Sequence, residues 1–146
     1  MRKLALAQFH QFAGYAPTVL RVMLGIVFAA HGWQKLTQTG PANFAGFLTS
    51  LNLPAPDILA WIVTLLELVG GILLILGLAT RLVALLFAVE MVGTTLLVKA
   101  DVGFIAQSAG AELDLRLMAG ALAILLLGPG RLALDNRLGL GEPATV

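Results

Sequence analysis

The chain has 146 residues, of which 59% are hydrophobic and 12% are charged, about half the charged share of ordinary soluble domains. A soluble fold of this size could not bury so much apolar surface, so the composition indicates helices that are covered by lipid. The net charge of +1 argues against a nucleic-acid partner, and the lack of cysteine excludes disulfides, thiol relays, iron–sulfur clusters and thiolate zinc sites.

Residues 1–16 are expected to form a short N-terminal arm in the cytosol or on the membrane surface. Met1, Arg2 and Lys3 resemble the start of a signal peptide, but Gln8 and His10 interrupt the apolar run that a signal peptide needs. We therefore expect no cleavage, so that the first spanning helix serves as an anchor.

Four later segments are apolar enough to cross a hydrocarbon core of about 30 Å at 1.5 Å per residue. We place them at Pro17–Leu36, Asp57–Leu78, Leu82–Val98 and Leu113–Leu127. The predicted fold is an all-α membrane protein, in which residues 17–135 form a bundle of four transmembrane helices.

The connection between the first two predicted spans is expected to contain a helix of its own. A continuous helix is prevented by the residues Gly40, Pro41, Pro54 and Pro56. Between them, apolar residues recur at helical spacing, at Phe44, Phe47, Leu48 and Leu51. This pattern predicts a short amphipathic helix, and both an interfacial position and a lid packed over the bundle fit it.

The connection between the second and third spans is so short that these spans must form an antiparallel hairpin. Basic residues indicate its orientation, because they concentrate on the cytosolic side. A cytosolic N-terminus places most of them inside, namely Arg2, Lys3, Arg81, Arg131 and Arg137. Both termini are therefore expected in the cytosol, with residues 136–146 as a flexible tail.

Two basic residues, two glycines and one phenylalanine form one stripe along the first span. Successive steps of four, three, four and three place them on one helical face, at Arg21, Gly25, Phe28, Gly32 and Lys35. His31 lies next to this stripe. Further glycines inside spans predict close helix contacts, and they include Gly70, Gly71 and Gly77.

Two carboxylates, Glu67 and Glu90, fall near the centres of the second and third spans. On a hairpin they would be neighbours, so one must carry a proton or both must meet cations. We expect Arg21 or His31 to be the partner of Glu67, with Arg116 also able to reach inward. Such a network is either a binding or proton-handling site, or a set of hydrogen bonds that fixes the helix register.

Arg116 also has a predicted partner within its own span, because Glu112 precedes it by four residues on the same helical face. Two histidines make no convincing haem or metal site, and we expect no metal. The sequence contains no Gly-rich phosphate loop and no nucleophile elbow.

Several motifs between Arg21 and Asp135 resemble the DoxX family of small bacterial membrane proteins. They are, in chain order, Arg21-x3-Gly25, His31-Gly32-Trp33-Gln34-Lys35-Leu36, Leu53-Pro54-Ala55-Pro56, Glu67-Leu68-Val69-Gly70-Gly71, Thr80-Arg81 and Gly128-Pro129-Gly130-Arg131-Leu132-Ala133-Leu134-Asp135. The resemblance implies a four-helix protein of the bacterial inner membrane, related to the DoxD-type subunits of thiosulfate:quinone oxidoreductase. The positions that it marks are Arg21, Gly32, Lys35, Glu67, Gly71 and Arg81.

Two functions follow from these observations. In the first, the chain is a membrane subunit of a redox or oxidative-stress complex whose polar cluster lies beside a quinone-like ligand, with no cofactor of its own. In the second, it is a scaffold or assembly factor, and the same cluster binds a partner protein or a second copy. A transporter is disfavoured, because four short spans enclose little volume.

Overall fold

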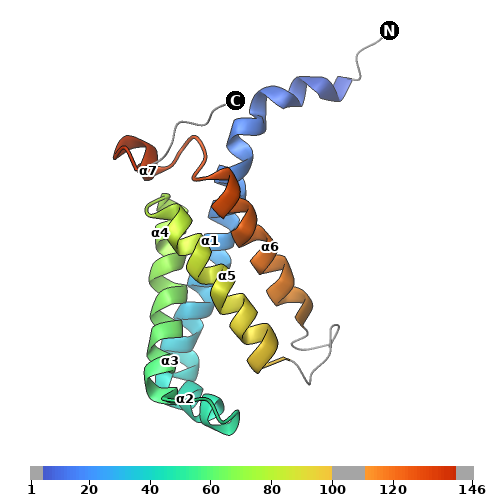
Figure 1. Ribbon diagram of the computed structural model, residues 1–146. Helices are drawn as coiled ribbons and strands as arrows, with labels where there is room; N and C mark the ends of the chain where they lie inside the picture. Colours follow the sequence, from blue (N-terminus) through green and yellow to red (C-terminus); the bar gives the residue numbers. More distant parts are fainter. Residues whose placement is uncertain (1–4, 100–110, 141–146) are drawn as a thin grey trace.

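The computed structural model describes residues 5–99 and 111–140, and within these ranges all regular structure is helical (Figure 1). A 3-10 helix of 11 residues precedes the first α-helix, and two short π turns extend or join α-helices. The elements in order are η1 (Ala5–Tyr15), α1 (Ala16–Gln34), η2 (Lys35–Thr39), α2 (Pro41–Ser50), α3 (Pro56–Leu65), η3 (Leu66–Gly70), α4 (Gly71–Leu76), α5 (Thr80–Leu97), α6 (Ala111–Leu127) and α7 (Leu134–Arg137).

Within the described ranges, three helices are long and apolar enough to cross a membrane: Gln11–Thr39, Pro56–Leu76 and Thr80–Leu97. They cover the first three predicted spans, except for Gly77, Leu78 and Val98 at the C-terminal ends of the second and third. The fourth predicted span forms helix α6, whose 17 residues reach about 25 Å at 1.5 Å per residue. Its first turn is acidic, which shortens the apolar part further. The predicted helix is thus confirmed. Helix α6 is not among the three helices that are long and apolar enough to cross a membrane.

The second spanning helix is interrupted by a π turn. Helices α3 and α4 continue through η3, which contains Glu67. A second π turn, η2, extends α1 and begins at Lys35. A π turn inserts one extra residue into a helix, redirects the side chains around it and is frequent at functional sites.

Close contact between α1 and the second spanning helix depends on glycine. A Cβ atom on Gly32 would lie 2.3 Å from the backbone N of Leu68, and one on Gly71 would lie 2.4 Å from the backbone N of Ala29. Gly25 faces the backbone of Gly71 in the same contact. Because the facing atoms belong to the backbone, only residues without a Cβ atom permit this approach.

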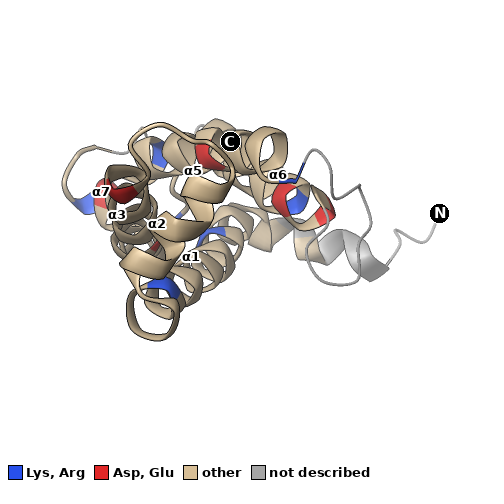
Figure 2. Cartoon of the chain, turned by 90° about the horizontal axis from the view of Figure 1, so that it is seen from below, with Lys and Arg blue, Asp and Glu red and all other residues tan. Residues whose placement is uncertain are grey.

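The core lies where α1, α4, α5 and α6 meet, and stacked rings of Phe28 and Phe87 stand at its centre, with centroids 3.6 Å apart. Around them pack Leu24, Leu74, Val83, Ala84, Ala88, Met91, Ala121 and Ile124. Large apolar side chains are exposed on the outside of the bundle, including Met23, Ile62, Val89 and Leu126. Charged residues are few among the helices (Figure 2). An apolar exterior of this extent suits lipid contact.

The connection between the first two spanning helices contains a helix, α2, as expected, and its position at the membrane interface stays a prediction. It packs against α3 through Ala45, Leu48 and Ala60, while Phe47 is exposed. Helix α2 lies at one end of the bundle, and η1 and α7 lie at the opposite end (Figure 1).

Candidate functional site

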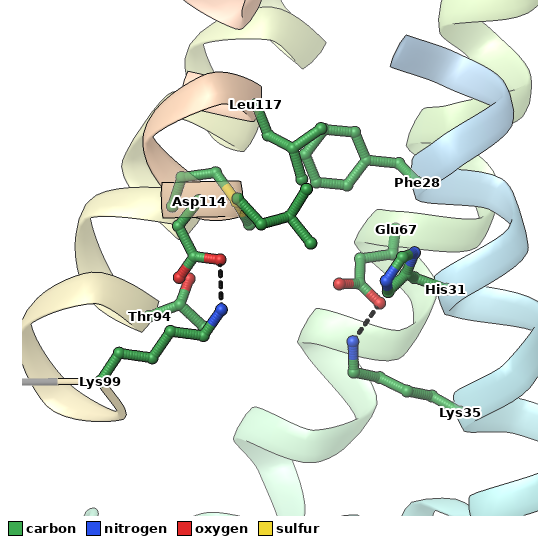
Figure 3. A pocket seen from close by; sticks show the side chains of 10 residues that line it. Phe28, His31, Lys35, Glu67, Thr94, Lys99, Asp114 and Leu117 are labelled. Carbon is green, nitrogen blue, oxygen red and sulfur yellow. Dashed lines mark hydrogen bonds and ion pairs between the residues drawn. The ribbon is translucent and has the colours of Figure 1, made fainter. Parts of the chain in front are cut away.

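Two buried ion pairs come together near the α2 end of the bundle. Lys35 Nζ donates to Glu67 Oε2 at 2.5 Å, and Lys99 Nζ donates to Asp114 Oδ1 at 2.6 Å. Both carboxylate side chains are only 6% exposed. The first pair joins η2 to η3, and the second joins the end of α5 to the start of α6. Figure 3 shows the two pairs on opposite sides of a pocket.

This pocket is a cavity of about 140 Å³. Its apolar wall is formed by Phe28, Met91, Leu113 and Leu117, and its polar wall by His31, Lys35, Glu67, Thr94, Lys99 and Asp114. A protein cavity of about 150 Å³ is known to hold benzene, so the volume corresponds to a single six-membered ring. An apolar cavity with a few converging polar groups is the usual form of a small-molecule site.

Glu90 of α5 is a neighbour of Glu67, as the hairpin of their two helices predicted. The two carboxyl groups lie close enough to interact through their charges, and the charge of Lys35 also acts on Glu90. Like charges at this distance repel each other in a low-dielectric interior, and the lysine offsets part of that repulsion. The arrangement therefore combines one lysine and two interacting carboxyl groups next to the cavity.

The structure separates Arg21 from this site, and its expected pairing with Glu67 is wrong. The guanidinium is 1% exposed and donates to backbone carbonyls instead, those of Leu74, Ile75, Pro129 and Leu132. Along the helix Arg21 lies about 21 Å from Lys35 at 1.5 Å per residue. It binds these carbonyls because helix ends and turns leave acceptors without helical partners.

His31 and Arg116 are also placed differently from the expectation. His31 lines the cavity, but its Nδ1 lies 3.0 Å from the carbonyl oxygen of Val27, and the acid group of Glu67 is bound by Lys35. Arg116 does not reach inward, since its side chain is 68% exposed. It donates to Glu112 at 3.0 Å, which confirms the pair predicted from their spacing.

Comparisons with known proteins place the chain among membrane proteins. The model of the DoxX family matches residues 16–100. The chain belongs to the DoxX family. Relatives of this DoxX-family chain include the protein named "Putative oxidoreductase CatD" of Bacillus subtilis, at 37% identity over 80% of the chain and 82% of the relative. An uncharacterised membrane protein of Mycobacterium tuberculosis is 33% identical over 82% of the chain and 78% of its own length.

A further relative is the inner membrane protein YphA of Escherichia coli, which is 25% identical over 89% of the chain and 97% of its own length. No solved structure matches the chain. The chain is therefore a membrane protein of the DoxX family, and one of its relatives carries an oxidoreductase name.

Two residues of the site in this DoxX-family protein were not predicted. Neither Lys99 nor Asp114 was singled out from the sequence. The sequence did contain a signal for this ion pair, since a lysine follows one apolar helix and an acidic residue lies in the first turn of the next. When two consecutive helices are antiparallel neighbours, the end of the first lies beside the start of the second. Lys99 falls within the residues that the family model matches, and Asp114 falls beyond them.

Proposed function

We propose that this protein is a multi-pass subunit of a redox or oxidative-stress system in a bacterial inner membrane, and that its cavity holds the ring of a quinone-like ligand. The observation that carries the proposal is a ring-sized cavity with aromatic and aliphatic walls and a lysine on each side. The name of the Bacillus subtilis relative supports a redox role.

The two lysines would bind the ligand's oxygens. An ammonium group has three donors, and the carboxylate bond between Lys35 and Glu67 uses one of those of Lys35. Phe28 and Leu117 would contact the ring face from the apolar side. In this proposal the chain contributes position and hydrogen bonds, while the electrons travel on the ligand or on a partner protein.

A binding experiment tests this role. The purified protein in lipid nanodiscs is analysed by mass spectrometry for retained quinone, and then titrated with benzene-1,4-diol without oxygen. We expect retention and binding in the parent protein, weaker binding in Lys35→Gln and Lys99→Gln, and unchanged binding in the control Arg116→Gln. Glutamine keeps a donor for the carboxylate, and circular dichroism checks that each variant is folded.

A scaffold is the second candidate, and it is favoured by the fact that each ion pair joins two different elements. In that role the pairs stabilise the bundle and the cavity needs no ligand. Absence of any ring binding, or binding that survives both lysine substitutions, would support the scaffold and reject the ligand site.

We further propose four membrane crossings with both termini in the cytosol, with α6 as the fourth crossing. The common location of η1 and α7 at one end of the bundle supports an even number of crossings (Figure 1). Reporter fusions at Val146 and within 37–56 should report opposite sides of the membrane. The same side for both fusions would reject this topology.

A further inference from the structure

The side chain of Arg131 lies against an aromatic ring at the end of the bundle where η1 and α7 are found (Figure 1). Its Cζ atom is over the ring of Tyr15, 5.4 Å from the centroid. The preceding Gly130 packs on the first turn of α1, since a Cβ atom on it would lie 2.5 Å from Thr18 Oγ1. Asn136 Nδ2 donates to the carbonyl oxygen of Gly130 at 2.6 Å. The backbone that carries Arg131 is therefore fixed against the start of α1.

The side chain of Arg131 also runs close to the backbone of η1. A Cβ atom on Gly14 would lie 2.9 Å from Arg131 Nε and 3.2 Å from its Cδ atom, so the glycine leaves room for the arginine. The residue is nevertheless exposed, and its side-chain N–H groups donate to no acceptor among the described residues. Contact with a ring stabilises the positive charge but supplies no oxygen acceptor, so these donors remain available to a ligand or to water.

The charge of Arg131 meets no carboxylate in the part of the chain that the structure describes. Asp135 is close in the sequence, but it is 3% exposed and its two oxygens accept from the backbone N–H groups of Ala79 and Thr80. The guanidinium therefore presents its charge to the surroundings of the bundle.

The elements next to Arg131 expose apolar side chains. Leu132 follows it in the chain, and η1 contributes Phe9 and Phe12, and all three are more than half exposed. Helix η1 bends away from the direction of α1 at this end of the bundle (Figure 1). Aromatic and basic side chains at the end of a membrane-spanning helix are typical of the membrane interface, where headgroup phosphates lie beside acyl chains.

We propose that Arg131, held on Tyr15, binds the phosphate of an anionic phospholipid, whose acyl chains contact the exposed apolar residues of η1. A guanidinium matches a phosphate, because two parallel N–H groups donate to two of its oxygens. A phospholipid is favoured over an acidic protein segment, because it combines an anion with apolar chains, as this surface combines a cation with Phe9, Phe12 and Leu132. The site is separate from the ring-sized cavity, so its test does not depend on the ligand proposed there.

Native mass spectrometry of the protein released from vesicles of equal phosphatidylglycerol and phosphatidylcholine tests the proposal. The two lipids share the phosphate and the acyl chains, and only the first has a net negative charge. We expect the parent protein to retain phosphatidylglycerol about fivefold over phosphatidylcholine, which corresponds to one basic residue at an anionic surface.

Arg131→Gln should reduce this ratio to less than about twofold, because the headgroup loses its cation. Arg137→Gln is the matched control, since this exposed arginine of α7 lies at the same end and contacts no aromatic ring among the described residues. The control should retain the ratio of the parent. Circular dichroism checks that each variant is folded.

Two substitutions of Tyr15 separate the position of the arginine from its charge. Tyr15→Leu removes the ring and should lower the ratio to less than about threefold, whereas Tyr15→Phe keeps the ring face and should retain it. Equal ratios in Arg131→Gln and Arg137→Gln would overturn the inference, because the general charge of this end would then attract the lipid. No lipid preference in the parent, or a parent-like ratio in Tyr15→Leu, would overturn it as well.

Discussion

Replacing Gly32 with alanine should separate two helices and disturb the candidate site at the same time. The added Cβ atom would lie 2.3 Å from the backbone N and 2.7 Å from the Cα atom of Leu68. Ordinary contacts begin near 3.4 Å, so α1 and η3 must move apart by about 1 Å, because backbone atoms cannot rotate away. Leu68 is adjacent to Glu67, and Gly32 lies one turn before Lys35.

The expected loss of stability is about 1–3 kcal/mol, which is typical of overpacked sites. Gly93 supplies the matched control, since it also lies within a spanning helix and a Cβ atom there meets nothing within 4 Å. Alanine at Gly93 should be neutral or stabilising by up to about 1 kcal/mol, because alanine has the higher helix propensity.

Thermal unfolding in a mild detergent, followed by circular dichroism, measures both variants against the parent protein. Ring binding by folded Gly32→Ala should also weaken, because the pair of Lys35 and Glu67 is displaced. Equal stability of the two alanine variants would show that the glycine contact does not set the distance between these helices.

Three other pairs of substitutions are predicted with the same assay. Glu67→Gln should keep most of the packing, whereas Glu67→Leu also removes the hydrogen bonds and should lose about 2 kcal/mol more; equal stabilities would contradict the buried network. Asp135→Ala removes the acceptor of two backbone N–H groups at the start of α5 and should lose about 1–2 kcal/mol, while the exposed Asp57→Ala at the start of α3 should lose less. Lys99→Met breaks a buried pair and should lose about 3 kcal/mol, against less than about 1 kcal/mol for Arg116→Met, and a reversed order would refute the assigned burial.

The helices themselves could be predicted from the sequence because apolar runs and proline boundaries are local signals. The spans ending near Leu36, Leu78 and Val98 and the short helix around Leu48 all appear in the structure. The glycine contacts along α1 follow from the spacing of Gly25 and Gly32, since residues seven apart share a helical face.

The partners of the buried charges could not be predicted, because they depend on features that hydropathy does not record. The π turns at Lys35 and Glu67 change the direction of both side chains. No local sequence pattern predicts these turns. Arg21 was assigned to a carboxylate because charge pairing is the usual solution inside a membrane. Its actual acceptors are carbonyls far along the chain, including that of Pro129, and only the assembled fold brings them near.

The carbonyl shell of Arg21 also bears on the order in which the protein assembles. Two of its acceptors, Leu74 and Ile75, belong to the second spanning helix, and the other two, Pro129 and Leu132, follow α6. During synthesis the first helix therefore enters the membrane with an arginine whose final hydrogen-bond acceptors have not yet been made. The segment that follows α6 supplies the last hydrogen-bond acceptors of Arg21 in α1. A nascent chain that ends before residue 128 therefore contains this arginine with only half of its acceptors. The full set of hydrogen bonds around Arg21 therefore requires the segment that follows α6, so the first helix completes its contacts last.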